Sequence, residues 1–322
     1  MSPIGDTLSP GLHPRETIAM KAVVLHEYGG PDKLRWEDTA VPAFGDNEVL
    51  VRVRATSINP IDYKVRSGAA KARFPVEFPG ILGRDLSGEV ADFGRSVTGF
   101  PKGMRVMALA NGTYAEYTVA KADVLAPIPE MMSFTQAAAL PLVVTTGAQL
   151  IERATQPKPG ETVLVTGALG SVGRTAVYVA KKLGARVLAG VRSREVDQAR
   201  RDLHADGVVA IDDEAEIAKL SDLDAIADTV SGPTIQRLMK ALRAGGRLGS
   251  VLGKPEGWEK YGIEVQDMMA VPDASRLHQL ADAVARGEFA IPIAKTMKLE
   301  EIAEAHRLAE SHATQGKIVL VP

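Results

Sequence analysis

Three evenly spaced glycines could hold a phosphate group. Gly167, Gly170 and Gly173 follow the short apolar run "TVLVT" and open the segment "SVGRTAVYVAKK". A strand that leads through a glycine turn into a helix points free backbone N–H groups and the positive end of the helix dipole at one place, which suits a pyrophosphate. Because the spacing is G-x-x-G-x-x-G and not G-x-G-x-x-G, a plain connecting turn is the alternative.

The surrounding pattern favours the nucleotide site. Apolar residues recur at helical spacing from 172 to 183, and Gly184 stands where a left-handed cap would end a helix. We predict that Gly167 allows the tight turn, that Gly170 lets the phosphate approach the backbone, and that Gly173 lets the helix pack on the strand. The predicted cofactor contacts in this loop are Gly167, Ala168, Gly170, Ser171 and Val172.

The end of the next predicted strand discriminates between the two nicotinamide cofactors. A site for NAD usually places Asp or Glu about 20 residues after the glycines, where it holds the ribose 2′-hydroxyl. Here that region reads Arg192, Ser193 and Arg194. Guanidinium groups and a hydroxyl suit a 2′-phosphate through charge-assisted hydrogen bonds, so the sequence favours NADPH. Solvated loop arginines are the alternative.

Other catalytic patterns are absent or misplaced. Tyr178 and Lys182 have the spacing of a short-chain dehydrogenase pair, but they lie on the glycine-loop helix itself, so we predict that Tyr178 is a packing residue. No G-x-S-x-G elbow, P-loop or H-E-x-x-H motif is present. The histidines lack metal-ligand spacing. They are His13, His26, His204, His278, His306 and His312.

Composition points to a globular protein with small-molecule partners. The 322 residues are enough for two domains, and 45% of them are hydrophobic. A net charge of −2 gives no general attraction to nucleic acid or to an anionic membrane. The chain has no cysteine, which excludes disulfides, thiolate nucleophiles and sulfur-ligated zinc, and which fits a cytoplasmic location.

The termini and the apolar runs predict neither a secretion signal nor a membrane span. Residues 1–19 carry prolines and polar residues without the apolar core of a signal peptide, and we predict a flexible tail there. We expect the folded part to begin at Met20. No apolar run reaches the about 18 residues that a membrane helix needs.

Two patterns of elements divide the rest of the chain. From Met20 to about Ala126, β-branched runs are separated by turn residues, which predicts a β-rich domain. From 162 onward, strands alternate with helices, which predicts a parallel sheet covered by helices. The predicted fold is therefore α/β, with a Rossmann domain over 143–285, and with a β-rich domain over 20–142 and 286–322 whose type the next motifs specify.

Several separated motifs together resemble one family. The motifs are "MKAVVLHEYGGPDKL", "SINPIDYKVRSG", "FPGILGRDLSGEV", "GTYAEYTVA", "LPLVVTTGAQLI", "VLVTGALGSVG" and "GKIVL". They resemble, in order, the landmarks of the zinc-independent quinone oxidoreductases among the medium-chain dehydrogenases/reductases. The resemblance implies a GroES-like catalytic domain, completed by the end of the chain, with the active site in the cleft beside the Rossmann domain. It also implies a homodimer, joined through the segment "YGIEVQDMMAV".

The same resemblance implies roles for individual residues. Zinc-dependent relatives bind metal in the segments that here hold Asn59, Arg84 and Asp85, so we predict that no metal is bound. Asn59 and Thr145 would border the nicotinamide and the substrate, with Asn59 donating to the developing oxyanion. Tyr63 would line the pocket or relay a proton, with packing as the alternative. Asp62 would brace the loop, and Lys317 would reach the cofactor or lie at the surface.

The predicted activity is NADPH-dependent, metal-free reduction of quinones or other α,β-unsaturated carbonyl acceptors. Without a Lewis acid, an acceptor that conjugation already activates is favoured. An enone or enoyl-thioester reductase is the near alternative, and a non-catalytic NADPH sensor or interaction protein is the distant one. Val196 and Asp212 stand near positions where relatives carry a Lys and a Tyr as adenosine-phosphate contacts, which leaves that contact to the two arginines.

Overall fold

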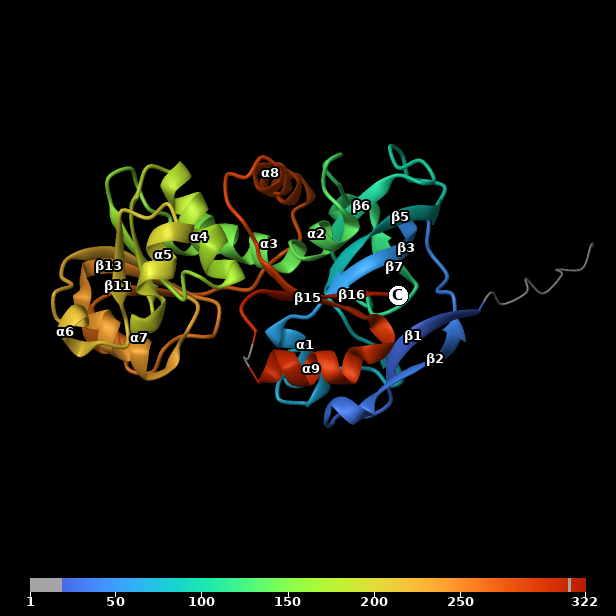
Figure 1. Ribbon diagram of the computed structural model, residues 1–322, viewed down its shortest axis with the longest axis horizontal. Helices are drawn as coiled ribbons and strands as arrows, with labels where there is room; N and C mark the ends of the chain where they lie inside the picture. The colour runs from blue at the N-terminus through green and yellow to red at the C-terminus, as the bar shows by residue number, and fades with distance from the viewer. Residues whose placement is uncertain (1–18, 312–313) are drawn as a thin grey trace, which may run out of the picture.

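The computed structural model describes residues 19–311 and 314–322, which form a β-rich half and an α/β half side by side (Figure 1). The expected tail lies outside the described residues except for Ala19. Ala19 begins the first strand, one residue before the predicted Met20.

The α/β half is built on a parallel sheet in the order β11-β10-β9-β12-β13-β14. This is the doubly wound order, in which the direction of winding reverses between β9 and β12. β9 and β12 are apolar and buried, as central parallel strands covered on both faces must be. The strands are β9 (Thr162–Thr166), β10 (Arg186–Val191), β11 (Gly207–Ala210), β12 (Leu223–Asp228), β13 (Leu242–Ser250) and β14 (Glu264–Asp267).

The helices between these strands confirm the predicted alternation. They are α4 (Ser171–Lys182), α5 (Val196–Asp202), α6 (Glu214–Ile217) and α7 (Gly232–Leu238), with the 3-10 turn η4 (Ser193–Glu195) before α5. Gly184 has φ +80° after α4, as the cap prediction required. The sequence pattern predicts one of these helices from about Thr234 to Leu242. α7 ends earlier, at Leu238, and Leu242 already pairs with Leu223 of β12.

The β-rich half contains a sheet in the order β15-β16-β3-β5-β6-β8, with β7 on β3, and a smaller sheet β2-β1-β4. β16 comes from the end of the chain and pairs antiparallel with β3, which confirms that the last segment completes this half. The strands are β1 (Ala19–Leu25), β2 (Leu34–Ala40), β3 (Glu48–Ser57), β4 (Gly80–Ile81), β5 (Asp85–Phe93), β6 (Arg105–Leu109), β7 (Tyr117–Lys121), β8 (Ala126–Pro127), β15 (Ile293–Lys298) and β16 (Lys317–Val321).

One helix joins the two halves. α3 (Pro141–Gln149) packs so closely on α4 that there is no room for a side chain at Gly147. A Cβ there would lie 2.5 Å from the carbonyl oxygen of Val172. Figure 1 shows α3 and α2 running from the α/β half toward the β-rich half. The remaining helices are α1 (Pro60–Arg66), α2 (Phe134–Ala138), α3 (Pro141–Gln149), the π-helix η3 (Leu150–Thr155), α8 (Ala274–Ala285) and α9 (Ile302–Glu310).

Candidate active site

The glycine loop has the geometry of an anion site. Gly167 has φ +61°, a conformation that favours glycine, and it turns the chain directly after β9. Gly170 precedes α4, and a Cβ there would meet the carbonyl oxygen of Gly167 at 3.2 Å. The N–H groups of Ser171, Val172 and Gly173, at the start of α4, have no carbonyl partner within the helix. The loop therefore presents donors and little side-chain bulk to a phosphate.

Two loop predictions change in detail. A Cβ at Gly173 would lie 2.3 Å from the oxygen of Gly167 and 2.7 Å from the Cα of Ala168. Gly173 thus lets α4 pack on the loop itself, whereas we predicted packing on the strand. The N–H of Ala168 donates to the oxygen of Gly190 at 3.1 Å. That N–H is not available to a cofactor phosphate.

A buried carboxylate organises the strand ends beside this loop, and the sequence reasoning missed it. Asp228, at the end of β12, is fully buried. It accepts hydrogen bonds from the hydroxyls of Thr166 at 2.9 Å and Ser250 at 2.8 Å, which ties together the carboxyl ends of β9, β12 and β13. An acidic residue closing the apolar run "LDAIAD" was the available signal, since a buried charge needs partners.

The predicted ribose-phosphate residues follow β10. Arg192, Ser193 and Arg194 are exposed, and neither guanidinium forms an ion pair with another described residue. Ser193 is already engaged, because its N–H and its hydroxyl both donate to Asp212 at 2.7 Å. The Ser193 hydroxyl bond lowers the pKa of Asp212. Both guanidinium groups are therefore without an ion-pair partner among the described residues, and the Asp212 carboxylate lies close enough to Arg192 to feel its charge.

In the β-rich half, Asn59 lies between β3 and α1 and is 1% exposed. Asp62 accepts from the N–H of Asn59 at 2.8 Å and from the hydroxyl of Tyr114 at 2.9 Å, which confirms that Asp62 braces this loop. Burial raises the pKa of Asp62 to about 7, and the nearby charge of Asp85 acts in the same direction. The loop therefore carries a carboxyl group that titrates near neutral pH.

The side chain of Asn59 lies between two opposite charges. Its Oδ1 accepts from Nζ of Lys317 at 2.6 Å, and its Nδ2 donates to Oδ2 of Asp85 at 2.7 Å. Lys317 is only 5% exposed, so it does not lie at the surface. The segments of Asn59 and Asp85, which correspond to metal-binding segments of zinc-dependent relatives, thus meet around the ammonium group of Lys317.

α3 connects this cluster with the glycine-loop helix. The N–H of Leu142, in its first turn, donates to Oδ1 of Asp85 at 2.7 Å, where the helix dipole also favours negative charge. Thr145 lies on the next turn and is 3% exposed. Tyr63, on α1, is only partly buried, and its pKa is raised by burial and by the nearby charges of Glu310 and Asp62. The structure therefore places Asn59 and Thr145 on elements that Asp85 joins.

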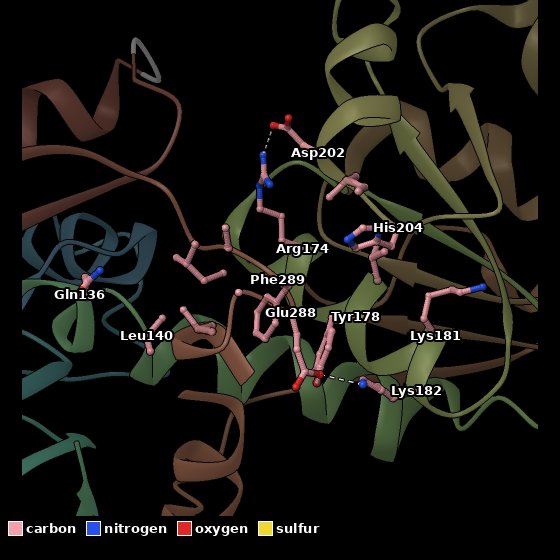
Figure 2. Close-up of a pocket in the computed structure, with 16 residues that line it drawn as sticks. Gln136, Leu140, Arg174, Tyr178, Lys181, Lys182, Asp202, His204, Glu288 and Phe289 are labelled. Carbon is pink, nitrogen blue, oxygen red and sulfur yellow. Dashed lines mark hydrogen bonds and ion pairs between the residues drawn. The ribbon is translucent and has the colours of Figure 1, made fainter. Parts of the chain in front are cut away.

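Tyr178 lies in a different environment, consistent with a packing role. Its ring stacks on Phe289 at 4.4 Å, and its hydroxyl donates to Glu288 at 2.7 Å (Figure 2). Together with Lys182 these side chains line a cavity of about 640 Å³. Among the described residues that line it, none is a predicted catalytic or cofactor residue.

Residues 19–311 and 314–322 offer neither a cluster of metal ligands nor a membrane-spanning helix. No group of three or more His, Asp or Glu side chains there is placed to hold a metal ion. No helix there is long and apolar enough to cross a bilayer. The histidines His13 and His312 lie outside the described residues.

Comparisons with known proteins match both halves. Residues 45–130 match the alcohol dehydrogenase GroES-like domain, and residues 203–320 match the zinc-binding dehydrogenase family. A chloroplastic NADPH-dependent alkenal/one oxidoreductase of Arabidopsis thaliana is 30% identical over 94% of this chain and 80% of that protein. The chain belongs to the medium-chain dehydrogenase/reductase family.

Other members of this family are similar over different lengths. A mouse quinone oxidoreductase is 36% identical over 179 residues, so the match spans 54% of that protein. The quinone oxidoreductase structure from Coxiella burnetii has a TM-score of 0.86 and 30% identity, covering 95% of this chain and all of that one. The Escherichia coli quinone oxidoreductase complexed with NADPH has a TM-score of 0.83 and 27% identity, covering 94% and 100%. This medium-chain dehydrogenase/reductase is an NAD(P)H-dependent oxidoreductase.

Proposed function

We propose that this oxidoreductase uses NADPH to reduce quinones or other conjugated carbonyl compounds without a metal. The observation that carries the proposal is the Asn59 amide, held in a buried site between Lys317 and Asp85. A fixed N–H donor of this kind can stabilise negative charge that develops on a carbonyl oxygen. The bound cofactor would supply the hydride.

The choice of NADPH rests on the residues after β10. Arg192 and Arg194 leave two guanidinium groups open to solvent, which supports binding of a 2′-phosphate. The N-terminus of α4 and the uncrowded approach at Gly170 support binding of the pyrophosphate. The Arabidopsis and Escherichia coli relatives, whose names include NADPH, add support.

We propose metal-free chemistry because the side chains at this place do not suit a metal ion. Asn59 and Asp85 direct their oxygens at the ammonium of Lys317, and an arginine, Arg84, cannot serve as a metal ligand. Asn59 would donate to the acceptor oxygen, and Thr145 on α3 would border the same space. A proton for the product would come from solvent or from a nearby hydroxyl such as that of Tyr63.

Reduction of a conjugated C=C bond is the second candidate. The similarity to the Arabidopsis alkenal/one oxidoreductase favours it, because an enone also places developing charge on a carbonyl oxygen. The same Asn59 donor would serve both reactions, so acceptor preference must be measured.

Steady-state oxidation of NADPH and of NADH, with panels of quinones, enones and enoyl thioesters, tests the function. We expect turnover with NADPH and a quinone or an enone, and we expect it to persist after treatment with a chelator. Preference for an enone or enoyl thioester would select the second candidate. Tight NADPH binding without turnover of any acceptor would contradict both and would support a cofactor sensor.

A further inference from the structure

We infer that Lys317 is a positioning residue that, together with Asp85, holds the Asn59 amide in one orientation, and that it is not a ligand of the cofactor phosphates. The inference rests on the proposed function in one respect only, namely that Asn59 faces the reacting carbonyl. It assigns Lys317 partners inside the protein, whereas the resemblance implied either a contact with the cofactor or a position at the surface.

The ammonium of Lys317 has no hydrogen left for a phosphate. It donates to the carbonyl oxygen of Ile58 at 3.0 Å, to Oδ1 of Asn59 at 2.6 Å and to Oδ2 of Asp85 at 3.2 Å. A lysine ammonium has three hydrogens, so these three oxygens use all of them. To bind a cofactor phosphate, Lys317 would have to leave a site in which it is 5% exposed.

Asp85 balances this charge and is fully buried. Its Oδ2 accepts from the Ser57 hydroxyl and from Nδ2 of Asn59 as well as from Lys317, and its Oδ1 accepts from the N–H of Leu142. Every one of these groups can act as a donor toward a carboxylate. The pair is thus enclosed and saturated with partners, which is what a buried ion pair requires.

The two charges dictate which way the amide of Asn59 points. An ammonium is only a donor and an ionised carboxylate is only an acceptor, so the amide oxygen must face Lys317 and the amide nitrogen must face Asp85. Asp85 takes one hydrogen of Nδ2, and the second hydrogen stays available. With Lys317 gone, the amide oxygen loses its donor and Asp85 alone holds the side chain. The second N–H of Asn59 is then no longer fixed toward the acceptor oxygen.

The first experiment separates positioning from cofactor binding. Lys317→Met should lower kcat by at least about tenfold, as expected when an oxyanion donor is misplaced. The affinity for NADPH, measured by direct titration without an acceptor, should stay within about twofold, since no phosphate contact is lost. Lys298→Met is the matched control, because Lys298 ends the neighbouring strand β15 with an exposed side chain. A tenfold loss of NADPH affinity with unchanged kcat would overturn the inference.

A double-mutant cycle tests whether Lys317 acts through Asn59. Asn59→Ala removes the donor, so adding Lys317→Met to that variant should lower kcat little further. If the two losses multiply, Lys317 acts by another route and the inference is wrong.

Binding of a small cation tests the Lys317 site through the Tm, which can be measured without turnover. Lys317→Ala leaves a space lined by oxygens of Ile58, Asn59 and Asp85, and ethylammonium should fill it and raise the Tm of this variant. The Tm of the wild type and of Lys298→Ala should not rise, and kcat of Lys317→Ala should partly recover. If the wild type turns over no acceptor, the proposed function fails, but the Tm comparison still decides whether the cation site exists. No selective Tm rise would count against the inference, even if the variant is poorly folded.

Discussion

Among single side chains, we predict that Arg192 and Arg194 determine the preference for NADPH over NADH. Replacing both with Ala should weaken NADPH binding by about tenfold or more, because each charge-assisted contact to a phosphate contributes more than 1 kcal/mol. Binding of NADH, which lacks the 2′-phosphate, should change little. Fluorescence titration with the two cofactors measures this, and equal losses for both would contradict the assignment.

Asp212 gives the opposite expectation at the same site. Its carboxylate accepts from Ser193 and stands beside the arginines. Asp212→Asn removes the negative charge and keeps an oxygen acceptor for Ser193. We expect tighter NADPH binding and unchanged NADH binding in the same titration. Weaker NADPH binding would mean that the carboxylate is needed to shape the site.

Asp62 should make stability depend on pH. Its pKa is about 7 in the folded protein and 3.8 is its ordinary value, so the stability that its protonated form contributes is lost as pH rises through about 4 to 7. Tyr114, Asp85 and Lys317 are the titratable groups that act on it. Between about pH 5 and pH 8, the free energy of unfolding of Asp62→Asn should rise by about 3 kcal/mol relative to that of the wild type. Urea unfolding at the two pH values measures the gain, and a constant difference would refute it.

Local pattern was sufficient to place the glycine loop between a strand and a helix and the arginines after the next strand, because spacing along one strand and one helix sets these positions. It was not sufficient for the Lys317–Asp85 contact, whose residues are 232 positions apart. The meeting of these two side chains depends on β16 pairing with β3 and on β3 pairing with β5. No local periodicity encodes that register.

At the level of elements, two glycines of the loop should separate folding from cofactor binding. Gly173→Ala places a Cβ 2.3 Å from the oxygen of Gly167, so α4 must shift and the Tm should fall by several degrees. Gly170→Ala has ordinary φ and meets one atom at 3.2 Å, so its Tm should change little. Gly170→Ala should nevertheless weaken NADPH binding, because its methyl group intrudes on the phosphate approach. Equal Tm values for both variants would contradict this account.

Element types were predictable where the pattern was strong, and element ends were not. The alternation of strands and helices and the Gly184 cap were visible in the sequence. The predicted end of α7 was wrong, because pairing of Leu242 with Leu223 overrides the helical pattern. The segment "YGIEVQDMMAV" contains the end of the 3-10 helix η6 (Trp258–Tyr261) and the four-residue strand β14 at the edge of the sheet.

For the molecule as a whole, we propose a dimer formed along β14. β14 is an edge strand, and Met269, just after it, is 51% exposed. Met269→Asp should shift the mass measured by light scattering from dimer toward monomer. Met131, 89% exposed in the β-rich half, provides the control, and Met131→Asp should leave the mass unchanged. A wild-type protein that is monomeric at high concentration would exclude the dimer.

We propose that both halves of the molecule take part in one reaction. The glycine loop holds NADPH, and the fixed Asn59 amide donates to the acceptor oxygen on which negative charge develops. The most direct measurement is single-turnover oxidation of NADPH by a conjugated acceptor, with chelator-treated enzyme and with cofactor deuterated at C4. We predict complete oxidation without added metal, slower with the deuterated cofactor, and strongly reduced in Asn59→Ala. Tight NADPH binding with no oxidation, or oxidation only after zinc is added, would contradict the claim.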